Sequence, residues 1–171
     1  MNKNKRRYAA KPTLFLTRGA LIAALYVALT YLSSVFGLSS GVIQFRISEM
    51  LCILPILLPE AVPGLFIGCL ISNLVTGGAP WDVVFGSIAT LVGAVGALFL
   101  SRLPKKLKWV ATLPTIISNA VIVPFVLMYV YGATDSYFFI MATVALGEIV
   151  CAGVCGSILY YSLSKTKIFK F

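Results

Sequence analysis

The sequence contains no histidine and only 11% charged residues, with five acidic side chains among 171 positions. It has four cysteines and no C-x-x-C pair, and each cysteine lies in an apolar run. These absences give no support to a metal site, a redox pair or a hydrolytic catalytic set. A G-x-x-x-x-G-K-[ST] phosphate loop is also missing, so ATP hydrolysis by this chain is not expected. We expect no enzyme activity and no bound cofactor.

The sequence is rich in apolar side chains, and 60% of its residues are hydrophobic. A soluble domain carries roughly 25% charged residues. The composition therefore predicts an all-α integral membrane protein, a single domain over residues 1–171 with room for about six helices of ~20 residues. The expected spans cover 17–36, about 46–58, about 62–75, the run after "TGGAPWD" to about 100, 109–131 and 137–163. The second and third are short, which implies tilt or partial burial.

The positive charges predict how these spans are oriented. Of the 14 basic residues, all but Arg46 lie before the first span, between the fourth and fifth spans, or after the last. Six spans place those three segments on one side, and the positive-inside rule makes that side the cytoplasm. We predict cytoplasmic termini, with basic segments at 1–16 and 164–171. The net charge of +9 then reflects topology and anionic lipid headgroups, and gives little support to nucleic-acid binding.

Polar residues inside or beside the spans are the candidate binding groups. An ionisable side chain in the hydrocarbon costs ~2.5–3.5 kcal/mol on insertion scales, so each one needs a partner or a function. Two of the candidates fall near the predicted midplane and the others toward the outer half, so they can line one cavity that opens outward. The candidate substrate-binding residues are Gln44, Arg46, Glu49, Asn73, Asp82, Asn119 and Glu148.

Each candidate also has a structural interpretation. Arg46 and Glu49, three residues apart, share one face of a helix, where they can pair with each other or hold a ligand between them. Asp82 follows a turn and suits a helix cap as well as a binding site. The two asparagines can join helices by hydrogen bonds. Glu60 is placed at the cytoplasmic start of a helix and is given no substrate role. Glu148 is hardest to explain structurally, because no basic residue is predicted at its depth.

A stripe of small residues runs along the first span. Ala20, Ala24 and Ala28 recur at every fourth position and make a smooth face that lets another helix approach closely. That helix can belong to a partner protein or to the chain itself.

Five segments carry a resemblance to a known family: "IQFRISE", "LLPEAVPGLFIGCLISN", "WDVVFGSIATL", "LPTIISNAVIV" and "ALGEIVCAG", in this order. Over nearly its whole length the chain resembles the QueT family, substrate-binding S components of energy-coupling-factor (ECF) transporters. The resemblance implies ATP-driven uptake of a queuosine precursor, a 7-deazaguanine such as the aminomethyl form or queuine, across a bacterial cell membrane. Its implied partners are an ECF transmembrane coupling subunit, docked on the alanine stripe, and two cytoplasmic ATPase subunits that use the ATP.

The candidate residues suit such a ligand. A deazaguanine presents two adjacent N–H donors and a carbonyl oxygen, and the aminomethyl group is a cation. Carboxylates among the candidates can accept the donors, and the guanidinium and amides can donate. Three aromatic residues near the predicted outer end can stack on a flat base: Phe45, Trp81 and Phe85. In this interpretation Arg46 and Glu49 line the ligand site and pair with each other when it is empty.

Other classes of protein remain open. An ion-coupled secondary transporter of a small polar or aromatic metabolite can also use Glu148, although many such folds have two related halves and the sequence shows no convincing repeat. A membrane enzyme needs a catalytic set that the sequence does not offer. If the protein were a purely structural subunit, the predicted buried acid Glu148 would have no function.

Overall fold

The structure, a computed structural model, describes residues 12–38 and 44–166. Within those ranges every regular element is a helix, which confirms the predicted all-α class. The α-helices are α1 (Pro12–Val35), α2 (Ala61–Val75), α3 (Pro80–Phe99), α4 (Leu113–Tyr129), α5 (Tyr137–Glu148) and α6 (Gly156–Lys165). The remaining elements are the 3₁₀ helices η1 (Ile47–Ile56), η2 (Leu100–Arg102) and η3 (Lys105–Thr112), and the π-helical segment η4 (Ile149–Cys155).

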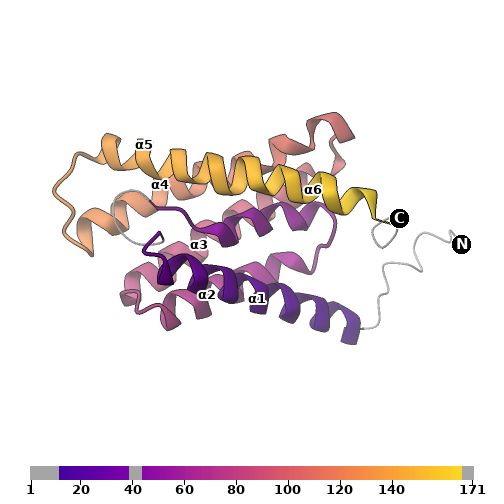
Figure 1. Ribbon diagram of the computed structural model, residues 1–171, viewed down its shortest axis with the longest axis horizontal. Helices are drawn as coiled ribbons and strands as arrows, with labels where there is room; N and C mark the ends of the chain where they lie inside the picture. Colours follow the sequence, from indigo (N-terminus) through magenta and orange to yellow (C-terminus); the bar gives the residue numbers. More distant parts are fainter. Residues whose placement is uncertain (1–11, 39–43, 167–171) are drawn as a thin grey trace, which may run out of the picture.

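These elements form an elongated bundle whose helices run lengthwise beside one another (Figure 1). Four continuous helical stretches are long and apolar enough to cross a membrane: Pro12–Val35, Pro80–Arg102, Lys105–Tyr129 and Tyr137–Lys165. Two shorter apolar helices, Ile47–Ile56 and Ala61–Val75, occupy the positions of the short second and third predicted spans. The sequence therefore predicted the number and order of the helices in the described part of the chain.

Four of the six helical stretches contain turns that are not α-helical: η2 and η3 extend α3 and α4, and the other two stretches contain η1 and η4. η1 is a 3₁₀ helix, and Pro55 within it lacks the N–H that an α-helical turn would use. Because a 3₁₀ helix rises about 2.0 Å per residue, against 1.5 Å in an α-helix, so short a segment still reaches deep into the bundle. The last stretch changes from α5 to the π-helical η4 and then to α6. The sequence predicted plain helices at both places.

η1 and η4 pack against each other inside the bundle. Irregular backbone at membrane depth is tolerated where protein covers it, and η1 is covered by its neighbours from Leu51 to Pro55. π-helical turns inside α-helices occur often at functional sites. The contact between these two irregular segments is therefore the first structural indication of where the site lies.

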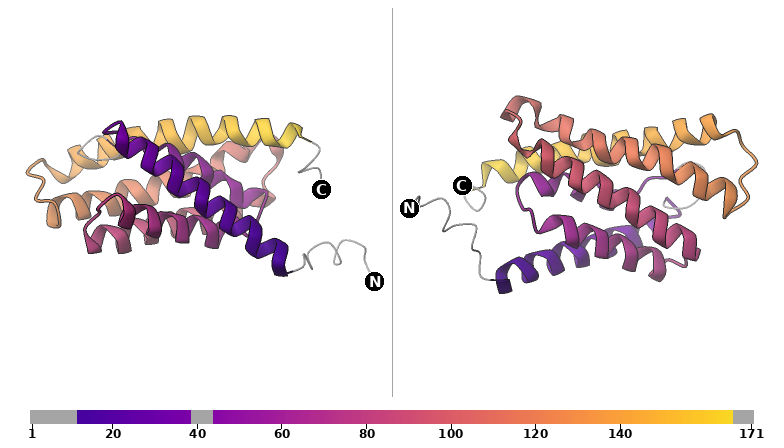
Figure 2. Two further views of the ribbon diagram at one scale, coloured as in Figure 1. Left: turned by 60° about the horizontal axis from the view of Figure 1, so that its bottom comes forward. Right: turned by 180° about the vertical axis from the view of Figure 1, so that it is seen from behind.

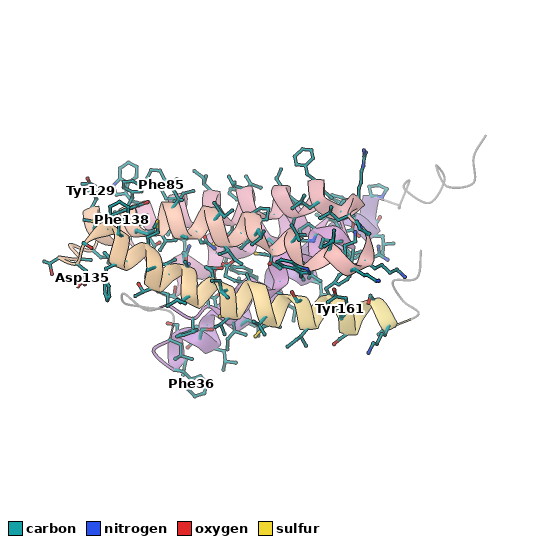
Figure 3. All side chains as sticks on the ribbon, turned by 90° about the horizontal axis from the view of Figure 1, so that it is seen from above. Phe36, Phe85, Tyr129, Asp135, Phe138 and Tyr161 are labelled. Carbon is teal, nitrogen blue, oxygen red and sulfur yellow. The ribbon has the colours of Figure 1, made fainter. Side chains whose placement is uncertain are left out.

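Most large side chains on the outside of the bundle are apolar, as a lipid-facing surface requires (Figure 3). Aromatic side chains gather near one end, where Tyr129, Phe138 and Phe85 lie beside Asp135. Trp and Tyr rings favour the membrane–water interface. The protein is a multi-pass membrane protein, and this end of the bundle marks one interface.

The start of α1, the η2–η3 connection and the end of α6 all lie at the opposite end, on the right of Figure 1. Figure 2 shows the same separation of ends from two other directions. The basic segment 102–108 thus lies at the same end of the bundle as the start of α1 and the end of α6, as the six-span topology requires.

We expect a cysteine introduced at Ser136 to react with a membrane-impermeant thiol reagent applied to intact cells. A cysteine introduced at Lys106 should react only after the membrane is opened, because the positive-inside rule assigns that end to the cytoplasm. The two variants are best compared in a background without the four native cysteines. Labelling of the Lys106 position alone in intact cells would invert the predicted topology.

Candidate functional site

Glu49, in the first turn of η1, is the centre of a buried polar cluster. Its side chain is 1% exposed, and both of its oxygens have partners. The Tyr26 hydroxyl of α1 donates to Oε1. The Cys52 thiol donates to Oε2 at 3.1 Å. Burying a carboxylate costs least when donors take the place of water, so these bonds explain how this acid is held inside the bundle.

Arg46 immediately precedes η1, and its backbone is extended there, with φ −96° and ψ 98°. Its Nη1 donates to Asn73 Oδ1 of α2 at 3.4 Å, and the guanidinium interacts electrostatically with Asp82 and Glu49. The predicted ion pair with Glu49 is wrong: among the described residues the sole ion pair joins Arg18 to Glu60. The helical spacing argument fails because η1 begins only after Arg46. Its Nε is buried and has no hydrogen-bond partner within residues 12–38 and 44–166.

Asp82 lies in the first turn of α3 and is 8% exposed. The N-cap residue of this helix is Ala79, without a side-chain cap bond, so Asp82 is not the N-cap, although its charge in the first turn suits the helix dipole. Instead Oδ2 accepts from the Tyr131 hydroxyl at 2.9 Å, and that hydroxyl accepts from the Ala79 N–H at 3.0 Å. Partial burial raises the pKa of Tyr131, the Ala79 N–H lowers it and the bond to Asp82 raises it again, and the net rise keeps the hydroxyl a donor. Tyr131 thereby ties the α4–α5 connection to the start of α3.

Glu148 is the last residue of α5, directly before the π-helical η4, and is 8% exposed. Asn119 of α4 donates its Nδ2 to Oε1 at 2.9 Å. The sequence placed these two residues at similar depth, and the packing of α4 on α5 brings them together. The other oxygen, Oε2, is buried and has no hydrogen-bond partner in the described part of the chain. Glu148 also interacts electrostatically with Glu49 and Arg46, so both acids and the arginine belong to one cluster.

The last two predicted residues join the cluster from different sides. Asn73 is 2% exposed, and its Nδ2 lies 3.5 Å from Cys69 Sγ. Gln44 approaches through its backbone: a Cβ added to Gly147 would collide with the Gln44 carbonyl oxygen. Only glycine allows this close approach beside Glu148. The structure thus brings six of the seven predicted residues together from η1, α2, α3, α4, α5 and the residue before η1, and for Gln44 it shows only a backbone approach to Gly147.

Three donors in this region were not predicted from the sequence: the Cys52 thiol and the hydroxyls of two tyrosines, Tyr26 and Tyr131. Tyrosines are common at membrane interfaces, so nothing in the sequence distinguishes these two. The predicted stacking of aromatic rings on a ligand disagrees with the structure at Trp81 and Phe85. Trp81 and Phe85 stack on each other, with centroids 6.1 Å apart, and are 61% and 43% exposed. They face outward from α3 whereas Asp82 is buried, so the prediction that they stack on a ligand in the cluster is wrong.

A separate groove of about 700 Å³ lies on the outer face of α1 and α2. Its lining is almost entirely apolar and includes the three alanines of the sequence stripe, Ala20, Ala24 and Ala28. All three are exposed, while α1 packs on α2 through Gly19 and Ala23. In Figure 2 (left), α1 crosses obliquely on the outside of the bundle. The alternative that the stripe packs against the chain's own helices is therefore wrong.

A buried, partly unsatisfied polar cluster inside a multi-pass helical membrane protein is suited to binding a polar solute within the membrane, as membrane transport proteins do. The chain belongs to the QueT transporter family, whose family model matches residues 16–165. This membership confirms that the protein is a transporter and not an enzyme. It is 38% identical over 92 residues to a protein of Lactococcus lactis subsp. cremoris (strain MG1363) called "Queuosine precursor transporter QueT". That alignment covers 53% of this chain and 53% of the relative, about half of each. No solved structure matches the chain.

Proposed function

We propose that this protein is the substrate-binding S component of an ATP-driven ECF importer in a bacterial cell membrane, and that it binds a queuosine precursor from outside. The substrate is a 7-deazaguanine such as the aminomethyl form or queuine. Family membership and the name of the Lactococcus lactis relative support this substrate class. The protein itself needs no cofactor, because its partner subunits use the ATP.

One observation carries the proposal. The cluster contains a buried acceptor, Glu148 Oε2, and a buried donor, Arg46 Nε, and neither has a partner in the part of the chain that the structure describes. An unsatisfied buried polar group costs about 1–3 kcal/mol, more when it is charged. A 7-deazaguanine that carries an amine supplies both missing partners, since its N–H groups, those of the amine included, can donate to the carboxylate and its carbonyl oxygen can accept from the guanidinium. Substrate binding then gives each of these two unsatisfied atoms a charge-assisted hydrogen bond.

The apolar groove supports the second half of the proposal. An ECF coupling subunit would lay a helix along Ala20, Ala24 and Ala28, because small residues let helix backbones approach closely in lipid. Two cytoplasmic ATPase subunits would act through that coupling subunit. The groove lies on the outer face of α1 and α2, whereas the buried cluster lies inside the bundle, so docking and substrate binding use different surfaces.

An ion-coupled secondary transporter is the second candidate, and the buried Glu148 favours it, since carboxylates inside membranes often carry protons. Such a carrier would move its substrate in proteoliposomes containing this chain alone, driven by an ion gradient. An S component would transport only with ATP-loaded partners.

Mass spectrometry of the small molecules released when the purified chain is denatured tests the substrate. We expect a 7-deazaguanine to be released in an amount comparable to that of the protein. A protein purified from cells that lack queuosine precursors should release none and should bind an added deazaguanine. Release of an unrelated metabolite, with no binding of deazaguanines, would contradict the proposal.

A further inference from the structure

The buried cluster contains three carboxylates, Glu49, Asp82 and Glu148, and a single guanidinium, that of Arg46. None of these groups forms an ion pair within the described chain, where the one such pair is Arg18–Glu60 at 3.0 Å. With all groups ionised, acids therefore outnumber the base in a region shielded from water. Uncompensated charge of this kind is expensive in a membrane protein.

The three carboxylates differ in how the chain satisfies them. Glu49 receives a tyrosine hydroxyl and a thiol, one on each oxygen. Asp82 receives the Tyr131 hydroxyl. Among the described residues Glu148 accepts only from the Asn119 amide, on Oε1, and its Oε2 accepts no hydrogen bond although the side chain is only 8% exposed. The oxygen without a donor, Glu148 Oε2, therefore belongs to a cluster in which negative charge is in excess.

Glu148 also interacts repulsively with Glu49, and its attraction to Arg46 offsets that repulsion only in part. A neutral N–H donor at Oε2 would satisfy the hydrogen bond but leave that repulsion in place. A cation at Oε2 satisfies both, because it donates a proton and offsets the excess charge.

We infer that Glu148 Oε2 is the counter-ion of a protonated amine on the substrate, and that Glu148 selects amine-bearing precursors over neutral ones. This inference rests on the proposed function and assigns a role within the same site. The guanidinium of Arg46 then donates from its Nε to the carbonyl oxygen of the ring. Glu49, with both oxygens occupied, holds η1 to α1.

The test compares two ligands that differ in charge at one substituent, 7-aminomethyl-7-deazaguanine and 7-methyl-7-deazaguanine. The full chain, purified in detergent, should bind the amine roughly tenfold to a hundredfold more tightly, as expected for a charge-assisted hydrogen bond. In Glu148→Gln that preference should fall to near one, while affinity for the methyl compound changes little. Retained binding of the methyl compound also shows that the variant is folded.

Glu60→Gln is the matched control, because Glu60 is another buried carboxylate but pairs with Arg18 outside the cluster. It should keep the full preference for the amine. If Glu148→Gln does not fold, Glu148→Asp, which keeps the charge but withdraws it by one methylene, should show a reduced preference that stays above one.

Two results would overturn the inference while leaving the proposed function intact. One is equal binding of both ligands by the unaltered chain. The other is a Glu148→Gln variant that weakens both ligands in the same proportion, which would mean that Glu148 reads the ring. If the unaltered chain binds neither deazaguanine, the proposed function fails and the inference fails with it.

Discussion

Replacing Arg46 with methionine is expected to abolish measurable substrate binding. Arg46 is the sole basic side chain in the cluster that the structure describes, and its Nε is a buried donor that the chain itself does not use. Its loss leaves Asp82 and Glu49 without their positive neighbour. Removing one charge from a buried set costs about 3–5 kcal/mol, so the variant should also unfold at a lower temperature.

Arg46→Lys separates binding from folding. Lysine keeps the positive charge but lacks the planar fork of donors, so the fold should survive while affinity falls roughly tenfold or more. Arg18→Met is the control, because Arg18 pairs with Glu60 outside the cluster. Substrate titrations of the three variants, each alongside a thermal unfolding curve, provide the measurement. A folded Arg46→Met protein with unaltered affinity would remove Arg46 from the site.

Replacing Ala24 with leucine is expected to leave substrate binding intact and to eliminate ATP-driven uptake. Ala24 lies in the groove between α1 and α2 and is exposed, so the larger side chain projects into the groove and away from the buried cluster. A partner helix that packs on small residues would be held off by it. Binding is measured on the isolated chain and uptake in proteoliposomes with the coupling subunit and the ATPases.

Ala142→Leu is a matched control, since Ala142 is an exposed alanine on α5 that does not line the groove. It should bind and transport as the unaltered chain does. Normal ATP-driven uptake by Ala24→Leu would contradict docking on the stripe. Uptake by the isolated chain in an ion gradient would favour the secondary-transporter alternative instead.

The cluster shows where sequence reasoning reaches its limit. Asn119 and Glu148 were placed at one depth by counting residues along regular helices, and they do meet, at 2.9 Å. Counting also paired Arg46 with Glu49, and there it failed, since the backbone at Arg46 is extended and η1 begins at the next residue. Periodicity is a reliable guide only where the helix is continuous.

Other features had no signal in the sequence at all. The Tyr26 hydroxyl reaches Glu49 across 23 positions, and Tyr131 reaches Asp82 across 49. The π-helical turns after Glu148 occupy a stretch, "IVCAGVC", whose composition suits an ordinary α-helix. Such contacts depend on which helices are neighbours, and a single sequence does not contain that information.

The sequence by itself determined that the protein is a helical membrane bundle, because apolar runs of this length can satisfy their backbone only as helices in lipid. It also determined which polar residues are costly in the membrane and so need partners, because that cost depends on residue type and depth. The tertiary structure alone decided which acid remains unsatisfied and which face of α1 stays open. Both depend on the side chains that neighbouring helices bring together, as with Tyr26 at Glu49 and Asn119 at Glu148.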